Sequence, residues 1–305
     1  MEVRQVPVVD IEALMALPTD VEVDAALRDV KDSALRKTIE EVRAAASEWG
    51  FFYIANHGLP EQEVHKFQGV MRSFFRLSKD VKRTIRRTPT NSRGYVEHEL
   101  TKNKKDCKEC FDFAGTNEDG PVNDKHLRLG DDENQWVEEK TLPGFRQEMG
   151  TYFNKMEYIA RRLLKVFAVA LGEEPAFFDQ FFHGDTRAFH RESQTWNNVP
   201  PRKGTYTINI GDMVQVWSND KFVAPLHRVL ANGGADRFSA PFFYNPSYRA
   251  QVESIVVKEG DVANYRPLSW GEFRLTRYQG NVADKGKEIQ IGDFKIHGPI
   301  DVANS

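Results

Sequence analysis

The sequence predicts an α+β fold, with long helices before residue 172 and short antiparallel strands in the last part of the chain. Apolar residues recur at three- and four-residue steps in three segments of the first part. From Val199 onward, short β-rich runs alternate with turn signals made of Gly, Asn, Asp and Pro. Helices kept apart from such strands indicate a barrel or double sheet packed against the helices.

The elements expected in the first part are a strand at 6–10, a helix at 31–48, a strand at 51–54, a helix after Pro60 and a long helix at 145–171. Residues 77–140 are polar and irregular, so we expect loops and short surface elements there. Gly172 is expected to end the long helix, because glycine adopts the left-handed conformation that follows many helices.

The elements expected in the last part are strands at 205–210, 213–217, 222–230, 237–244 and 252–258, and a helix after Ser269. Ser269 and Glu272 have the spacing of a capping box, which marks the start of a helix. With one or two N-terminal strands, this set gives six or seven strands, short of the eight that a closed double sheet of two Greek keys has.

A hairpin around Asn232, Gly233 and Gly234 is the most informative of these elements. His227 lies five residues before Asn232 and Arg237 five residues after it, so an antiparallel pair would place them opposite each other. Ser239 shares their face, because strand side chains alternate. The sequence therefore predicts an imidazole, a guanidinium and a hydroxyl gathered on one face.

Two interpretations of this cluster remain open from the residues alone. A buried guanidinium needs an anion, and its planar fork suits a carboxylate of a ligand. An internal salt bridge from Arg237 to Asp212 or Glu253 would satisfy it equally. His227 taken alone is more often a structural histidine than a ligand.

Composition limits the classes of function. The chain has 305 residues and a net charge of −3, and this charge argues against a nucleic-acid partner. No apolar run is long enough to cross a membrane. Two cysteines favour a reducing cytoplasm over a disulfide-stabilised secreted protein. We expect one compact unit, with an N-terminal region at 1–115 and a region at 116–305 that holds the long helix and the strands.

Several motifs, taken in order, resemble one family. They are Trp49 to Ile54 with Asn56-His57-Gly58, Lys108 to Phe113, Asn209 to Met213, Trp217-Ser218-Asn219, His227-Arg228-Val229, Arg237-Phe238-Ser239 and Tyr265-Arg266-Pro267. The set resembles the iron/2-oxoglutarate-dependent dioxygenases of the isopenicillin N synthase-like family, and it covers nearly the whole chain.

The resemblance implies a double-stranded β-helix (jelly-roll) core that uses Fe(II) with 2-oxoglutarate as co-substrate. His227 matches the distal iron ligand of the family, and Arg237 and Ser239 match the Arg-x-Ser pair that binds the far carboxylate of 2-oxoglutarate. The implied reaction is hydroxylation, desaturation or ring closure of a small organic substrate. The sequence does not indicate which substrate, nor the oligomeric state.

The family's His-x-Asp pair of iron ligands has no match at its expected place. Two pairs, His183 with Asp185 and His190 with Glu192, have the right residue types and spacing. The residues around them do not match those that surround the His-x-Asp pair in the family. We therefore expect weak iron binding and little 2-oxoglutarate turnover from the chain as written. The alternatives left open are a non-catalytic relative that keeps the carboxylate pocket, and an incomplete gene model or splice product of a working enzyme.

Overall fold

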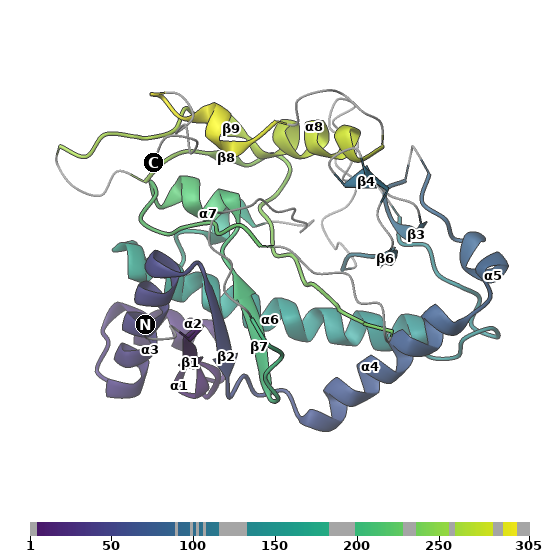
Figure 1. The fold of residues 1–305 in the computed structure, drawn as a ribbon. Coiled ribbons are helices and arrows are strands. Elements are labelled where there is room, and N and C mark those ends of the chain that lie inside the picture. Colours follow the sequence, from purple (N-terminus) through teal and green to yellow (C-terminus); the bar gives the residue numbers. More distant parts are fainter. Residues whose placement is uncertain are drawn as a thin grey trace.

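The computed structural model describes residues 5–88, 91–97, 100–101, 104–105, 108–115, 133–182, 199–227, 236–255, 260–282 and 289–297. For residues 100–101, 104–105 and 278–282 the description covers the backbone only. The long helices from before residue 172 form a lower layer in Figure 1, and the helices that follow residue 210 lie above them. The result is a mixed α+β arrangement with the long helices in the first part of the chain, as the sequence predicted.

A three-stranded sheet joins the start of the described chain to a strand that follows residue 199. It has the order β1–β2–β7, formed by Val8–Asp10, Phe51–Ala55 and Thr205–Asn209. β1 runs parallel to β2, and β7 runs antiparallel to it with Asn209 opposite Phe51. All three strands lie where the sequence predicted strands. This pairing places the end of β7 beside the start of β2.

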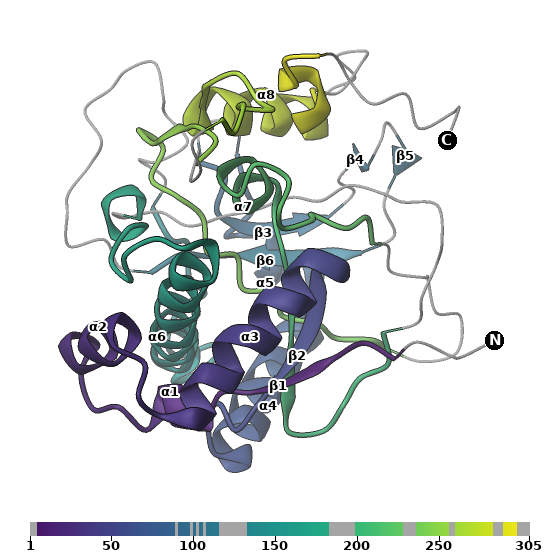
Figure 2. The same cartoon turned by 90° about the vertical axis from the view of Figure 1, so that its left-hand side faces the viewer.

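Helices α1 (Glu12–Met15), α2 (Asp20–Arg28) and α3 (Ser33–Glu48) surround the same sheet with the long helix α6 (Phe145–Leu171). Figure 2 shows α3 and α6 side by side. Their facing residues, such as Val42 and Val166, belong to the largest apolar core. Gly172 follows α6 at φ +93°, which confirms the predicted helix end.

A second apolar core lies between α4 (Glu61–Arg76), the first turns of α6 and a two-stranded sheet. That sheet pairs β3 (Gly94–Glu97) with β6 (Glu109–Asp112). The short helix α5 (Lys79–Arg83) follows α4, and β4 (Leu100–Thr101) pairs with β5 (Lys104–Lys105). The described residues between 77 and 140 thus form short elements between loops, as expected.

The last part of the described chain contains α7 (Asp212–Trp217), β8 (Gln251–Val252), β9 (Leu268–Ser269) and α8 (Trp270–Val282). Two 3-10 turns, Asp179–Phe181 and Ile291–Phe294, complete the elements of the described residues. The helix predicted after Ser269 is confirmed, and the Ser269 hydroxyl accepts a hydrogen bond from the Glu272 amide at 3.3 Å.

The strand predicted at 213–217 is wrong, because these residues form helix α7. Its buried residues Met213, Val216 and Trp217 follow helical spacing, whereas the β-branched residues in the run had favoured a strand.

The predicted hairpin is also not observed in its described parts, since residues 222–227 and 236–245 form no strand. Pro225 and Pro241 lie within these two segments, and proline cannot donate a hydrogen bond to a ladder. The turn at 228–235 lies outside the described residues.

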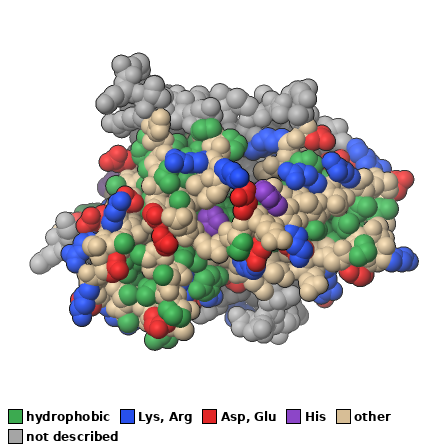
Figure 3. Space-filling model, turned by 90° about the horizontal axis from the view of Figure 1, so that it is seen from below, with side chains coloured by type: hydrophobic (Ala, Val, Ile, Leu, Met, Phe, Trp, Pro, Cys, Tyr) green, Lys and Arg blue, Asp and Glu red, His purple; other side chains and the backbone are tan. Residues whose placement is uncertain are grey.

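No helix in the described ranges is long and apolar enough to cross a membrane. Figure 3 shows one face of the molecule, on which basic and acidic side chains are interspersed. Neither sign dominates this face, in keeping with the small net charge of the chain.

Candidate functional site

The segment that carries His227 begins with a tight reversal after α7. Asn219 and Asp220 have φ values of +52° and +66°, a left-handed conformation that Asn and Asp tolerate better than most residues. The Ser218 hydroxyl accepts a hydrogen bond from the Phe222 amide at 3.0 Å and closes the turn. The chain then runs from the buried Phe222 toward the start of β2.

Backbone contacts hold this segment against α3 and β2. The Val223 amide donates to the carbonyl of Ala46 at 3.0 Å. Gly50 lies directly beneath, where a Cβ atom would be 2.2 Å from the Val223 carbonyl oxygen and 2.4 Å from Cδ of Pro225. Gly50 also has φ +62°, so glycine satisfies both the conformation and the close approach.

His227 is half-buried against the first residue of β2. Its ring meets the ring of Phe51 edge-on, with centroids 5.0 Å apart at 86°. Burial lowers the pKa of His227 to about 4, opposed by a hydrogen bond with the Pro225 backbone. The imidazole is therefore neutral at physiological pH, which is the form that binds metal ions.

Arg237 and Ser239 lie in a different environment. Both are exposed, while Phe238 between them packs on Phe75 at 6.1 Å and under the Arg72 guanidinium at 5.8 Å. Phe75 belongs to α4, whereas His227 contacts β2, so the described contacts do not bring the histidine together with the Arg-x-Ser pair. The ion pair of Arg237 with Asp212 or Glu253 is not among the ion pairs of the described residues.

An iron site of this family needs two histidines and a carboxylate around one metal. Within the described ranges, no group of three His, Cys, Asp or Glu side chains is placed to hold a metal ion. His183, Asp185, His190 and Glu192 lie outside those ranges. The described residues thus supply one suitable imidazole at His227 and do not complete a three-ligand site around it.

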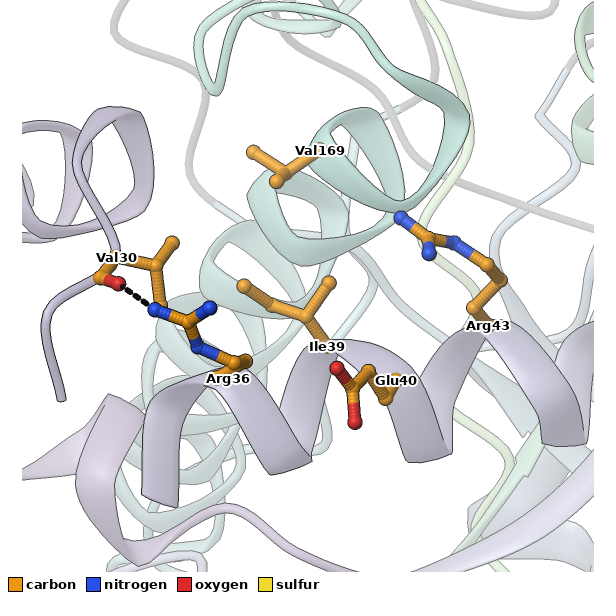
Figure 4. A pocket seen from close by; sticks show the side chains of 6 residues that line it. All are labelled: Val30, Arg36, Ile39, Glu40, Arg43 and Val169. Atoms are coloured by element: carbon orange, nitrogen blue, oxygen red, sulfur yellow. Dashed lines mark hydrogen bonds between the residues drawn. The ribbon is translucent and has the colours of Figure 1, made fainter. Parts of the chain in front are cut away.

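A shallow hollow of about 350 Å³ lies elsewhere, between α3 and the end of α6 (Figure 4). Its two arginines serve the fold, because Arg36 donates to the Val30 carbonyl at 2.6 Å and Arg43 to the Ala170 carbonyl at 2.8 Å. None of the predicted site residues lines it.

One cluster near the His227 segment was missed by sequence reasoning. Asp220 binds Tyr265, Asn264 and Lys295, which follow it by 44 to 75 residues. The motifs Trp217-Ser218-Asn219 and Tyr265-Arg266-Pro267 were both recognised, but their spacing gave no signal that the segments meet.

Two family profiles match the chain. The profile described as "non-haem dioxygenase in morphine synthesis N-terminal" matches residues 6–139, and that of the 2OG-Fe(II) oxygenase superfamily matches residues 170–246. The second match includes His227, Arg237 and Ser239, and it also spans His183, Asp185, His190 and Glu192.

Curated relatives match over nearly their whole length. A homoarginine-6-hydroxylase of Glycine max is 26% identical, over 92% of this chain and 96% of the relative. A 1-aminocyclopropane-1-carboxylate oxidase of Dictyostelium discoideum is 22% identical, over 92% of each. The soybean alignment extends over 333 positions, more than the 305 residues of this chain, so the relative has stretches without a counterpart here.

Solved structures share the fold. A full-length protein of Neurospora crassa, solved in complex with alpha-KG, matches with a TM-score of 0.68 at 19% identity, covering 91% of this chain and 96% of that one. JOX2 in complex with 2OG, Fe and JA matches with a TM-score of 0.66 at 20% identity, covering 88% and 84%. With the two profiles, the motifs and the shared fold in agreement, this chain belongs to the 2OG-Fe(II) oxygenase superfamily.

Proposed function

We propose that this chain oxidises a small organic substrate with Fe(II) and 2-oxoglutarate, and that His227 is one of its iron ligands. Family membership sets the reaction class and the cofactors. The observation that supports the role of His227 is its half-buried imidazole, which is kept neutral by burial and lies within the matched region 170–246. Bound Fe(II) would supply oxygen activation, while the protein holds the imidazole in place.

The likeness to enzymes named hydroxylase, oxidase and synthase is compatible with hydroxylation, desaturation or ring closure. A jelly-roll core is part of the same proposal. It is supported by the TM-scores of 0.66 to 0.68 with solved relatives, although the described residues form few of its strands. A cytoplasmic location remains the prediction made from the cysteine content.

The roles proposed for Arg237 and Ser239 follow from the way Phe238 is anchored. Phe238 packs against Phe75 of α4, whereas Arg237 and Ser239 on either side of it are exposed. An exposed guanidinium two residues from a hydroxyl can bind a carboxylate through several hydrogen bonds. We assign this pair to the far carboxylate of 2-oxoglutarate.

A second candidate is a relative that keeps the carboxylate-binding pair and holds iron weakly or not at all. One observation favours it: the soybean alignment extends over 333 positions, more than the 305 residues of this chain. Sequencing the natural transcript across residues 183–198 would show whether a segment with the missing ligands exists.

The two candidates differ in a binding and turnover assay. Purified protein is titrated with Fe(II) without oxygen, 2-oxoglutarate affinity is measured separately, and succinate release is then followed in air. Arg237→Ala should weaken 2-oxoglutarate binding about tenfold or more, because it removes charge-assisted hydrogen bonds, and should leave Fe(II) affinity unchanged. Arg249→Ala, at another exposed arginine, is the control. Equal losses of both affinities in Arg237→Ala would count against the assigned role.

A further inference from the structure

The Asp220 carboxylate is the centre of a hydrogen-bond network just after α7. It accepts hydrogen bonds from the Tyr265 hydroxyl at 2.5 Å, Gln215 Nε2 at 3.0 Å, Asn264 Nδ2 at 2.9 Å and Lys295 Nζ at 2.9 Å. Burial raises the pKa of Asp220, but the hydrogen bonds from Tyr265 and Lys295 outweigh it, and the net shift is downward. The carboxylate is therefore ionised and acts only as an acceptor.

This network fixes the orientation of the Gln215 side-chain amide. Its Nε2 donates to Asp220 Oδ1 and also to the Tyr265 hydroxyl at 2.8 Å. Because an ionised carboxylate can only accept, the NH₂ group of Gln215 must face it. The amide oxygen then points the opposite way and accepts from the backbone amide of Ala224 at 2.8 Å.

Ala224 lies three residues before His227, on the segment that crosses Gly50. Its neighbour Val223 is already fixed by the Ala46 carbonyl, and Pro225 has no amide hydrogen to donate. The hydrogen bond from the Ala224 amide to Gln215 is therefore the last one that a backbone N–H group donates before Pro225. Two residues beyond Pro225 lies His227, whose ring contacts the ring of Phe51.

We propose that Gln215 is a positioning residue for His227, and that Asp220, held by Tyr265 and Lys295, sets the orientation in which Gln215 acts. Gln215 does not contact the imidazole through any described bond; it acts through the backbone at Ala224. The consequence for metal binding rests on the proposed role of His227 as an iron ligand. The effect on the position of the ring does not depend on that role.

The test uses the whole chain and replaces Gln215 with Met, which keeps the side-chain length and removes the hydrogen bonds. Gln135→Met is the matched control, since Gln135 is a half-buried glutamine whose Nε2 donates to the Arg93 and Arg86 carbonyls at 2.6 and 3.3 Å. Two readouts without metal are followed by NMR: hydrogen exchange of the Ala224 amide, and the His227 ring resonances, which we expect the Phe51 ring 5.0 Å away to shift.

In Gln215→Met we expect the Ala224 amide to exchange about tenfold faster, the scale of one lost hydrogen bond. The His227 ring resonances should move toward their values in an unstructured peptide. Asp220→Asn should change both readouts in the same direction and by less, because an amide at position 220 permits either orientation of Gln215. Gln135→Met should leave both readouts at wild-type values even if it lowers the melting temperature.

The proposal is overturned if Gln215→Met lowers the melting temperature as Gln135→Met does and leaves the Ala224 exchange and the His227 resonances unchanged. Adding Mn(II) tests the metal role separately. Selective broadening of the His227 resonances in the wild type, at about tenfold lower Mn(II) than in Gln215→Met, supports both claims. Absence of broadening in the wild type refutes the iron-ligand role alone, while the metal-free spectra still decide the role of Gln215.

Discussion

Gly50→Ala should destabilise the protein through the segment that carries His227. Gly50 is buried at φ +62°, and a Cβ atom there would lie 2.2 Å from the Val223 carbonyl oxygen and 2.4 Å from Cδ of Pro225. The first of these atoms belongs to the backbone, so no change of side-chain conformation can relieve the contact. The segment must move away from β2, and the His227 ring must move with it.

The size of the effect has two parts. A residue with a Cβ atom in the left-handed region costs about 1–2 kcal/mol. Forcing extra volume into a packed site typically costs about 1–3 kcal/mol more. We expect Gly50→Ala to lower the free energy of unfolding by about 2–5 kcal/mol, from the sum of these two effects.

Gly58→Ala separates the two parts. Gly58 has φ +79°, and a Cβ atom added there would meet nothing within 4 Å, so only the conformational cost of about 1–2 kcal/mol applies. Urea unfolding followed by circular dichroism measures both variants against the wild type. The reasoning is refuted if Gly50→Ala costs no more than Gly58→Ala.

Two further predictions concern buried charges. Asp24→Asn should lower the free energy of unfolding by about 2–4 kcal/mol, because it removes one of two carboxylates from Lys165, which is 2% exposed. Asp29→Asn, in an exposed ion pair, should cost less than about 1 kcal/mol, and equal costs in urea unfolding would contradict this account. Burial lowers the pKa of His57, against a hydrogen bond with the Gly204 backbone, so its neutral form stabilises the fold above pH 6.5. That contribution should be lost as the pH falls below 6.5 through the lowered folded pKa, and a pH series of unfolding midpoints should show a smaller acid loss in His57→Gln.

The helical part of the fold could be predicted well from the sequence because its signals are local. The apolar spacing of residues 145–171 and the glycine that follows them define α6 without reference to any other element. The strands β1, β2 and β7 were found for a similar reason, since each is a short β-rich run bounded by turn signals.

The last part of the chain could be predicted less well because a strand depends on its partner. Residues 222–227 and 237–244 have apolar, strand-like composition, but Pro225 and Pro241 interrupt any ladder and these segments pack against β2 and α4 instead. At 213–217 two valines favoured a strand, and the helical spacing of Met213, Val216 and Trp217 prevailed.

The candidate site could also be predicted only in part. His227, Arg237 and Ser239 were identified from motifs, but their grouping on one hairpin face required a register that the described residues do not form. The contacts that hold the His227 segment come from residues far away in sequence, such as Ala46 and Tyr265. No local pattern carries that information.

The most direct test of the central claim is an anaerobic Fe(II) titration of the purified wild type and of His227→Gln, followed by succinate release in air with 2-oxoglutarate. The account predicts that the wild type binds Fe(II) and releases succinate, and that His227→Gln binds Fe(II) at least about tenfold more weakly and releases little succinate. Equal Fe(II) affinities in the two proteins would contradict the role of His227, and a wild type that neither binds Fe(II) nor releases succinate would contradict the proposed activity and leave the second candidate.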